Sequence, residues 1–272
     1  MEPGIHDISD EEYFAAYGLS NSYLWTFNNK TPAHAQVPFP PTDEMTLGSA
    51  VHIAVLQPDK IDAMIVQGPA DRRGKKWTDA KDKAEKAGQI ILIEKEYNIA
   101  MTMRDKVWQN PTFAGLLAGE GALYEQAAFW NYREQLCKCK LDCAKDSFIL
   151  DLKTSADASP AGFAQSVAKY GYHQQAASYK YGWEQASGQL IDAFLFLVIE
   201  KTPPYAPAIY ELDAASLREG WASYNAAIDK YIECAAAKHF PAYPDEKVLL
   251  QLPAWGFRHT NPREININGE QR

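Results

Sequence analysis

The stretch of sequence that decides the fold is residues 141–154, LDCAKDSFILDLKT. Apolar and polar residues alternate on both sides of a short polar turn at residues 145–147, and this period of two is typical of a β-hairpin. A turn centred there places Asp142 directly opposite Asp151, with both carboxylates on one face and about 5 Å between their Cβ atoms. Lys153 lies two residues beyond Asp151 and therefore points to the same face.

The preceding residues extend this row of acids. Residues 123–132, LYEQAAFWNY, have the composition of another strand, and a turn centred on residues 133–134 sets Glu125 opposite Asp142. A single β-bulge would break this register. Like charges at facing positions repel, but a divalent cation between them creates a binding site, because Mg²⁺ takes carboxylate oxygens. The spacing fits either a metal site or a solvated acidic face with surface ion pairs, and it does not choose between them.

The same residues resemble a known motif. Asp142, Asp151-Leu152-Lys153 and the upstream Glu125 are similar to the core of the PD-(D/E)XK nuclease superfamily. Four further segments resemble its phage exonuclease VIII (RecE) and RecB-like branch, in the order of that branch: residues 47–52, 72–77, 137–140 and 172–179. The resemblance runs from about residue 13 to about residue 259. It implies a mixed α/β fold (α+β) with a restriction-endonuclease-like core, in which helices flank a central mixed sheet that contains an antiparallel meander.

The rest of the chain supplies the elements that such a fold needs. Cap candidates at residues 9–10 and 20–21 open two N-terminal helices, and further helices are expected at residues 46–56, 78–87, 94–108, 160–169, 171–187 and 214–237. Additional strands are expected at residues 90–93, 190–200 and 208–212. Residues 31–42, with four prolines, are expected to form a surface loop.

Length and composition favour one large domain. The chain has 272 residues, of which 46% are hydrophobic, and no linker-like run divides it. We therefore expect a single nuclease domain over residues 1–272, with a core at about 120–240, a helical part at 1–119 and a Pro-rich tail at 241–272. The start of the sequence has no signal-peptide pattern and no apolar run approaches 18 residues, so a cytoplasmic protein without a membrane partner is expected. The net charge of −8 argues against tight non-specific coating of DNA and suits a shaped, metal-loaded channel.

Four cysteines raise the alternative of a metal or redox protein. Three of them lie within residues 137–143, and only Cys234 remains elsewhere. Zinc sites usually space paired cysteines by two to four residues and need a second pair, whereas Cys137 and Cys139 alternate along a strand with Leu141. Some RecB-like nucleases hold an iron–sulfur cluster, but with one distant cysteine and a C-terminal trio. The cysteine spacing of this chain differs, so no iron–sulfur cluster is expected. Instead, we expect reduced thiols that pack as apolar side chains.

The resemblance gives one histidine and one helix face a functional interpretation. A lone histidine on an apolar helix, such as His52, is more often a core residue, but in the resembling branch the histidine of this segment is a metal ligand. Tyr172, Gln175 and Tyr179 share one face of a helix and would ordinarily pack on a sheet. In the branch, a Gln-x3-Tyr motif at this place borders the active site and contacts DNA.

A basic segment is the last candidate for contact with DNA. Arg72, Arg73, Lys75 and Lys76 gather around Gly74, next to a tryptophan. Such a run is usually a solvated face. A basic loop with a glycine and an aromatic residue also suits phosphate contacts and base stacking, and we expect this loop to contact DNA.

The resemblance implies metal-dependent hydrolysis of DNA. One or two Mg²⁺ ions, or Mn²⁺ as a substitute, would be held by His52, Glu125, Asp142, Asp151 and the backbone carbonyl of Leu152, and Lys153 would orient the attacking water. It further implies an exonuclease that degrades one strand of linear duplex DNA from 5′ to 3′ and leaves a 3′ tail for a phage annealing protein, and that assembles as a ring-shaped homo-oligomer. The alternatives are a catalytically inactive DNA-binding or assembly module and a restriction-type endonuclease on the same core.

Overall fold

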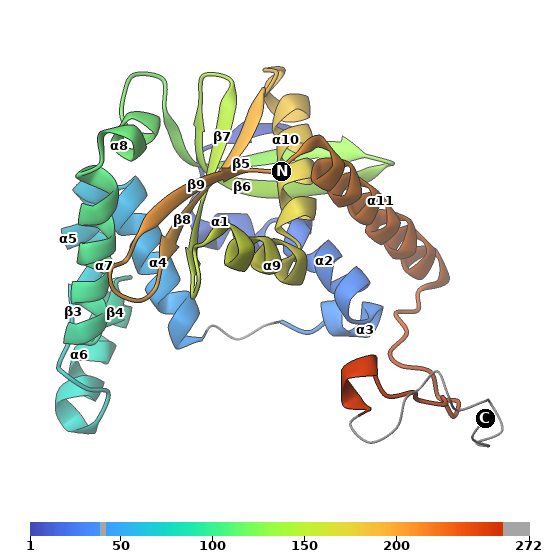
Figure 1. Cartoon of the computed structure of the whole chain (residues 1–272), viewed down its shortest axis with the longest axis horizontal. Coiled ribbons are helices and arrows are strands. Elements are labelled where there is room, and N and C mark those ends of the chain that lie inside the picture. Colours follow the sequence, from blue (N-terminus) through green and yellow to red (C-terminus); the bar gives the residue numbers. More distant parts are fainter. Residues whose placement is uncertain (39–41, 258–272) are drawn as a thin grey trace.

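A mixed sheet forms the centre of the molecule in the computed structural model, which describes residues 1–38 and 42–257 (Figure 1). The sheet has seven strands in the order β1-β5-β6-β7-β8-β9, and β2 pairs with β6 off this path. The strands are Gly4–His6 (β1), Leu19–Ser20 (β2), Leu123–Tyr132 (β5), Gln135–Lys145 (β6), Phe148–Ser155 (β7), Ala193–Glu200 (β8) and Pro207–Glu211 (β9). The pairs β7/β8 and β2/β6 are parallel and the others are antiparallel. The predicted fold class, a mixed sheet with an antiparallel meander, is confirmed.

The meander of β5, β6 and β7 has the predicted register at its first turn. Tyr124 pairs with Cys143 across β5 and β6, which sets the next residues, Glu125 and Asp142, at facing positions. Glu125 itself has a left-handed backbone, with φ of 54°. Because this conformation costs energy in a residue with a Cβ atom, β5 is locally distorted at the position of the acid.

The second turn also has the predicted register, but its ladder is short. Only three residue pairs join β6 to β7, and the last of them is Cys143 with Leu150. Nearer its N-terminus, β6 pairs with β2 instead. Asp142 and Asp151 therefore lie one step beyond the last pair, where the two strands separate, and are not ladder partners as the simple hairpin predicted.

Helices occupy most of the N-terminal third, as expected. They are α1 (Asp10–Ala15), α2 (Asn21–Asn29), α3 (Pro32–Ala35), α4 (Asp43–Leu56), α5 (Ile61–Met64), α6 (Gly74–Lys86), α7 (Glu94–Trp108) and α8 (Pro111–Leu117). Ser9 caps α1 and Ser20 caps α2, two of the predicted caps. Thr42 caps α4, which begins three residues before the predicted start at Thr46.

Several short elements differ from the predictions. Helix α3 lies inside the predicted loop of residues 31–42, of which residues 39–41 are outside the described part of the chain. Ile65–Gln67 (β3) pairs in parallel with Ile90–Leu92 (β4) in a separate two-stranded sheet. The sequence had predicted only the second of these strands. Elements of two to four residues have too few positions to show a period, so patterning does not reveal them.

Three helices follow the meander: α9 (Pro160–Tyr170), α10 (Tyr172–Ser187) and α11 (Ala214–Ala237). Gly171 joins α9 to α10 with a left-handed φ of 72°, and a Cβ atom there would lie only 2.4 Å from an atom of the Trp25 ring. Glycine is therefore required at this junction. The close approach fixes where α10 begins, and α10 carries three of the side chains of the candidate site.

The helices cover the two faces of the sheet and bury two apolar clusters (Figure 1). Helices α2, α9, α10 and α11 pack on one face, where Phe27, Trp183 and Tyr224 are buried. Helices α4, α7 and α8 pack on the other, with Val55 and Met103 in the centre of that cluster. The helix α4 contacts β6 and β7 directly, which brings its side chains to the fork between these strands.

All four cysteines are buried free thiols. Cys137 and Cys139 belong to the same cluster as Leu141, so the prediction that these thiols pack as apolar side chains is confirmed. Cys143 belongs to the cluster on the other face. The period-two alternation of β6 is thus interrupted at Asp142, between Leu141 and Cys143.

After α11 the chain continues with little regular structure up to residue 257, apart from the short 3₁₀ turn η2 (Ala254–Gly256). The rest of the predicted Pro-rich tail, residues 258–272, lies outside the described residues. No helix in the described ranges is both long and apolar enough to cross a membrane.

Candidate active site

Three side chains meet at the fork between β6 and β7. Glu125 comes from β5, Asp142 from β6 and His52 from α4, and each offers a ligand atom within 4.8 Å of the ligand atoms of the other two. The Nδ1 atom of His52 lies 3.4 Å from Oδ1 of Asp142. We call these three residues the metal cluster. Within residues 1–38 and 42–257, no other group of His, Cys, Asp and Glu side chains has this spacing.

A side-chain hydrogen bond of Asp142 takes the place of the backbone pairing that is missing between β6 and β7. Its Oδ2 atom accepts a hydrogen bond of 2.6 Å from the backbone N–H of Leu152, at the place where β7 separates from β6. Burial opposes ionisation of Asp142, but His52, Lys153 and this N–H together outweigh it and hold the pKa below its usual value. Asp142 is therefore a permanently ionised group at neutral pH. It leaves Oδ1 directed toward His52.

Glu125 is the acid of the metal cluster whose pKa lies near neutral pH. Burial, followed by repulsion from Asp142, raises its pKa to about 7. Lys140 lies 3.5 Å from its Oε2 atom and also pairs with Asp10 of α1. Lys140 was not among the predicted site residues, although it belongs to the segment 137–140 that carries part of the resemblance. The feature that could have indicated Lys140 is its position two residues before Asp142 on the same predicted strand.

Asp151 and Lys153 form a second group beside the metal cluster. Asp151 is 3% exposed, and its carboxylate pairs with Lys153 through Oδ2 and accepts a 2.6 Å hydrogen bond at Oδ1 from Nε2 of Gln175. Burial, partly offset by Lys153, raises the pKa of Asp151 to about 6. The ammonium group of Lys153 lies 4.9 Å from the centre of the Tyr172 ring. Asp151 is not one of the three clustered ligands, so its predicted role as a ligand stays a prediction.

The predicted face of α10 does point at this site. Tyr172 lies under Lys153 and Gln175 bonds to Asp151, as described above. Tyr179, one turn further on, is half-buried, and its pKa is raised well above the usual value by burial and by nearby acidic groups that include Asp151 and Asp142. The three side chains therefore border the acids. Their contact with DNA stays a prediction.

The basic residues 72–76 lie elsewhere. Arg72 makes a bidentate pair with Glu96 of α7, at 2.9 and 2.8 Å, and lies 3.5 Å from Asp43 at the start of α4. Arg73 pairs with Asp71. His52 is nine residues further along α4, which corresponds to about 13 Å of helix.

This segment is also not the loop that was expected. Gly74 begins α6, so that Lys75 and Lys76 occupy the first turn of that helix and are exposed to solvent. Any DNA that contacts them would be some distance from the metal cluster, and this contact remains a prediction.

The metal cluster has the chemistry of a divalent-cation site. Two carboxylates and one imidazole supply mostly oxygen ligands with one nitrogen, a set that Mg²⁺ and Mn²⁺ accept. The strained backbone of Glu125 and the broken alternation at Asp142 bring these like charges together, at a cost that a cation would offset. The backbone of Leu152, tied to Asp142 through its N–H, runs alongside the cluster.

The pH dependence of metal binding follows from these groups. The pKa of Glu125 is about 7, and the pKa of His52 is also raised, because Asp142 outweighs the effect of burial. Both side chains must lose protons to bind a cation, so protons compete with the metal below neutral pH. We expect the affinity for Mn²⁺ to fall by at least about tenfold from pH 7.5 to pH 6. Calorimetric titration in two buffers of different ionisation enthalpy would measure the released protons, and an affinity that is constant over this range would contradict the ligand assignment.

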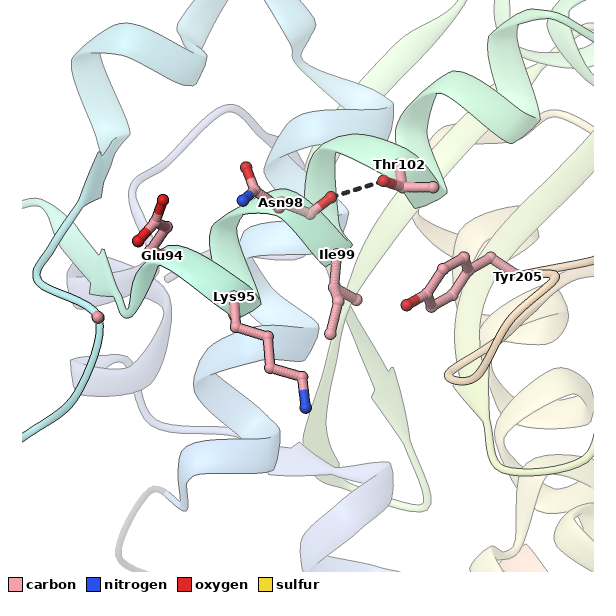
Figure 2. Close-up of a pocket in the computed structure, with 7 residues that line it drawn as sticks. Glu94, Lys95, Asn98, Ile99, Thr102 and Tyr205 are labelled. Atoms are coloured by element: carbon pink, nitrogen blue, oxygen red, sulfur yellow. Dashed lines mark hydrogen bonds between the residues drawn. The ribbon is translucent and has the colours of Figure 1, made fainter.

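A separate hollow of about 480 Å³ lies along α7 (Figure 2). Glu94, Lys95 and Asn98 line it from the helix, and Tyr205 closes it from the loop before β9. The backbone carbonyl of Asn98 accepts a 2.7 Å hydrogen bond from the hydroxyl of Thr102 on the next turn. None of the clustered acids reaches this hollow, so it has no part in the candidate site.

An acid followed on the neighbouring strand by Asp-x-Lys is the motif for which the PD-(D/E)XK nucleases are named, and here it lies where the β6/β7 ladder ends. The fold and the site define a protein of that class. Residues 27–250 match the family model described as "PDDEXK-like domain of unknown function (DUF3799)", and the chain belongs to this family. Nucleases of the class use divalent metals, which agrees with the donor set of the metal cluster.

Solved structures agree on the fold. A crystal structure from Eubacterium rectale, named "Putative exonuclease", superposes with a TM-score of 0.65 at 12% identity, covering 93% of this chain and 99% of the other. At this identity the likeness shows the restriction-endonuclease-like core and nothing finer. A phage related exonuclease from Haemophilus somnus 129PT covers 84% of this chain and 99% of its own, also at 12% identity, but its TM-score of 0.34 supports no inference. No curated protein matches the sequence at a significant level.

Proposed function

We propose that this chain is a Mg²⁺-dependent exodeoxyribonuclease of the cytoplasm that degrades linear double-stranded DNA from 5′ to 3′ and leaves 3′ single-stranded tails for recombination by annealing. The observation that carries the proposal is the metal cluster of His52, Glu125 and Asp142 beside the ion pair of Asp151 and Lys153. An inactive DNA-binding module would have no need to keep a buried, mutually repelling set of acids, because such a set is costly without a cation.

The side chains of the site have separable roles. His52, Glu125 and Asp142 would bind the cation, and the Leu152 carbonyl and Asp151 would complete its ligands from β7. A cation held there would make a bound water more acidic and offset negative charge on the phosphate. Lys153 stays protonated, because Asp151 and Asp142 raise its pKa despite burial. It can therefore orient the attacking water and stabilise charge on a phosphate oxygen.

The finer parts of the proposal rest on the resemblance to the exonuclease VIII and RecB-like branch. These parts are the 5′-to-3′ direction, a ring-shaped homo-oligomer around the DNA and an annealing protein as partner. The name of the Eubacterium rectale structure supports an exonuclease rather than a restriction-type endonuclease. The exposed residues Lys75 and Lys76 would contact duplex DNA away from the cut.

The test compares linear duplex DNA, labelled at either its 5′ or its 3′ end, with covalently closed circular DNA, each with Mg²⁺ or with EDTA. We expect cleavage of the linear DNA only, in Mg²⁺ only, with the 5′ label released first. Cleavage of the circle would replace the exonuclease with an endonuclease. Activity in EDTA would refute the metal site. An absence of cleavage in Mg²⁺ would favour the alternative function, a catalytically inactive DNA-binding module.

A further inference from the structure

A second cavity opens beside the metal cluster. It has a volume of about 800 Å³, and aromatic side chains form much of its lining, among them Tyr13, Phe14, Tyr17, Tyr23, Tyr179 and Tyr231. We call it the aromatic groove. It lies between α1, the start of α2, β6, α10 and α11.

Two residues connect the aromatic groove to the site. Lys140 lines the groove and lies 3.5 Å from Glu125, one of the metal-cluster acids. Tyr179 also lines the groove, and it lies one helical turn after Gln175, whose amide bonds to Asp151. A polymer whose phosphate is held at the metal cluster would therefore reach the groove within one or two units of its chain.

The walls of the groove suit flat, polar-edged groups. The hydroxyl oxygens of Tyr17 and Tyr231 lie 3.4 Å apart, and Nε2 of Gln36 donates a 2.6 Å hydrogen bond to the hydroxyl of Tyr23. Aromatic faces thus alternate with hydrogen-bonding edges. An apolar peptide or a second copy of the chain would be better matched by aliphatic walls, whereas nucleobases have both a π-face and polar edges.

At the mouth of the groove, aromatic surface is left in water. Phe14 is 76% exposed and Tyr17 is 63% exposed. Two lysines, Lys138 and Lys140, line the wall, and the ammonium group of Lys140 also pairs with Asp10 and Glu125. Lys138 is held in place by hydrogen bonds of 2.7 Å to the carbonyls of Tyr13 and Ala16, with its ammonium 4.5 Å from the Tyr13 ring.

We infer that the aromatic groove binds unpaired nucleobases of the strand that is being cut. Phe14 and Tyr17 stack on bases at the mouth, Lys140 faces the connecting phosphates, and Tyr179 lies between the last bound base and the metal cluster. The faces and edges of a base are free to contact aromatic side chains only when the base is unpaired, so the strand must separate from its complement before it enters. The inference rests on the proposed function, since it assigns the path of the DNA to that active site.

The test measures binding without cleavage. A fluorescein-labelled oligothymidylate of eight nucleotides is titrated with the protein in Ca²⁺, and its anisotropy gives the affinity. Because loss of a stacking aromatic weakens single-strand binding substantially, the double variant Phe14→Ala/Tyr17→Ala should bind at least about tenfold more weakly than wild type. Trp255→Ala removes an aromatic that is 82% exposed and lies outside the groove, so it should bind within about twofold of wild type.

The outcomes separate the groove from the proposed function. Equal affinity of wild type and the double variant would overturn the inference, as would no binding by wild type or an equal loss in Trp255→Ala. Cleavage of linear duplex by wild type, measured separately, decides the exonuclease proposal whatever the oligonucleotide shows. Both replaced side chains are mostly exposed, and Phe14→Ala alone serves if the double variant unfolds in circular dichroism.

Discussion

Replacing Lys153 with alanine is expected to lower the rate of DNA cleavage by about 100-fold or more, in the range that loss of a positioned proton-transfer or charge-stabilising group usually costs. The ammonium of Lys153 is the cation of this chain that pairs with Asp151, and it lies over the Tyr172 ring at the edge of the metal cluster. Without it, β7 would present no positive side-chain charge to the phosphate. Binding of DNA should change much less than the rate, because most of the contact surface remains.

The variant should still fold. The pKa of Asp151 is already about 6, so that this carboxyl can take up a proton when its partner is lost and avoid an unpaired buried charge. Rates under single-turnover conditions, with thermal unfolding followed in parallel, would measure both effects. Lys81→Ala is a matched control, because Lys81 is half-exposed on α6 and its one ion pair within residues 1–38 and 42–257 is with Glu85. A rate of Lys153→Ala within a few-fold of this control would remove Lys153 from the mechanism.

The register of the meander was predictable because short turns fix it. The alternation on both sides of residues 145–147 and 133–134 determines which residues face each other, and the structure has these pairs. The end of the β6/β7 ladder was not predictable. Before this point β6 pairs with Leu19 and Ser20 instead, a two-residue strand more than 100 positions earlier in the chain that no local pattern reveals.

The composition of the metal cluster was predictable only in part. Spacing led to Glu125 and Asp142, but it placed Asp151 in the same row, whereas the break in the ladder turns Asp151 toward Lys153 and Gln175. His52 was expected from resemblance alone, since one histidine on an apolar helix has no pattern that distinguishes a ligand from a core residue.

The basic residues 72–76 show a different limit of prediction from sequence. Four positive charges in five residues predicted an open loop, but Arg72 is occupied by Glu96, 24 positions away, and residues 74–76 start a helix. Local sequence does not reveal such distant partners. Lys140 was overlooked for the same reason, because its importance comes from Glu125 on the neighbouring strand.

Replacing Asp142 with asparagine is expected to weaken binding of Mn²⁺ or Mg²⁺ by at least about 100-fold, more than the loss of an outer-shell partner usually costs. Asp142 is the metal-cluster acid whose pKa is held low, and it contacts both His52 and the Leu152 N–H. The amide oxygen of asparagine can still accept the bond from Leu152, so the fork between β6 and β7 should keep its geometry. Cleavage in Mg²⁺ should be lost together with the metal.

The control for this change lies on the same hairpin. Asp146 is a turn residue with a left-handed φ of 51°, a conformation that asparagine adopts readily. Asp146→Asn therefore removes the same charge four residues away without removing a ligand.

Calorimetric titration of Mn²⁺ at pH 7.5 into wild type, Asp142→Asn and Asp146→Asn is the most direct measurement of the central claim, that the metal cluster holds the catalytic cation. We expect saturable binding by wild type and Asp146→Asn and its loss in Asp142→Asn. Equal binding by all three proteins, or no binding by a wild type that cleaves DNA, would contradict the claim.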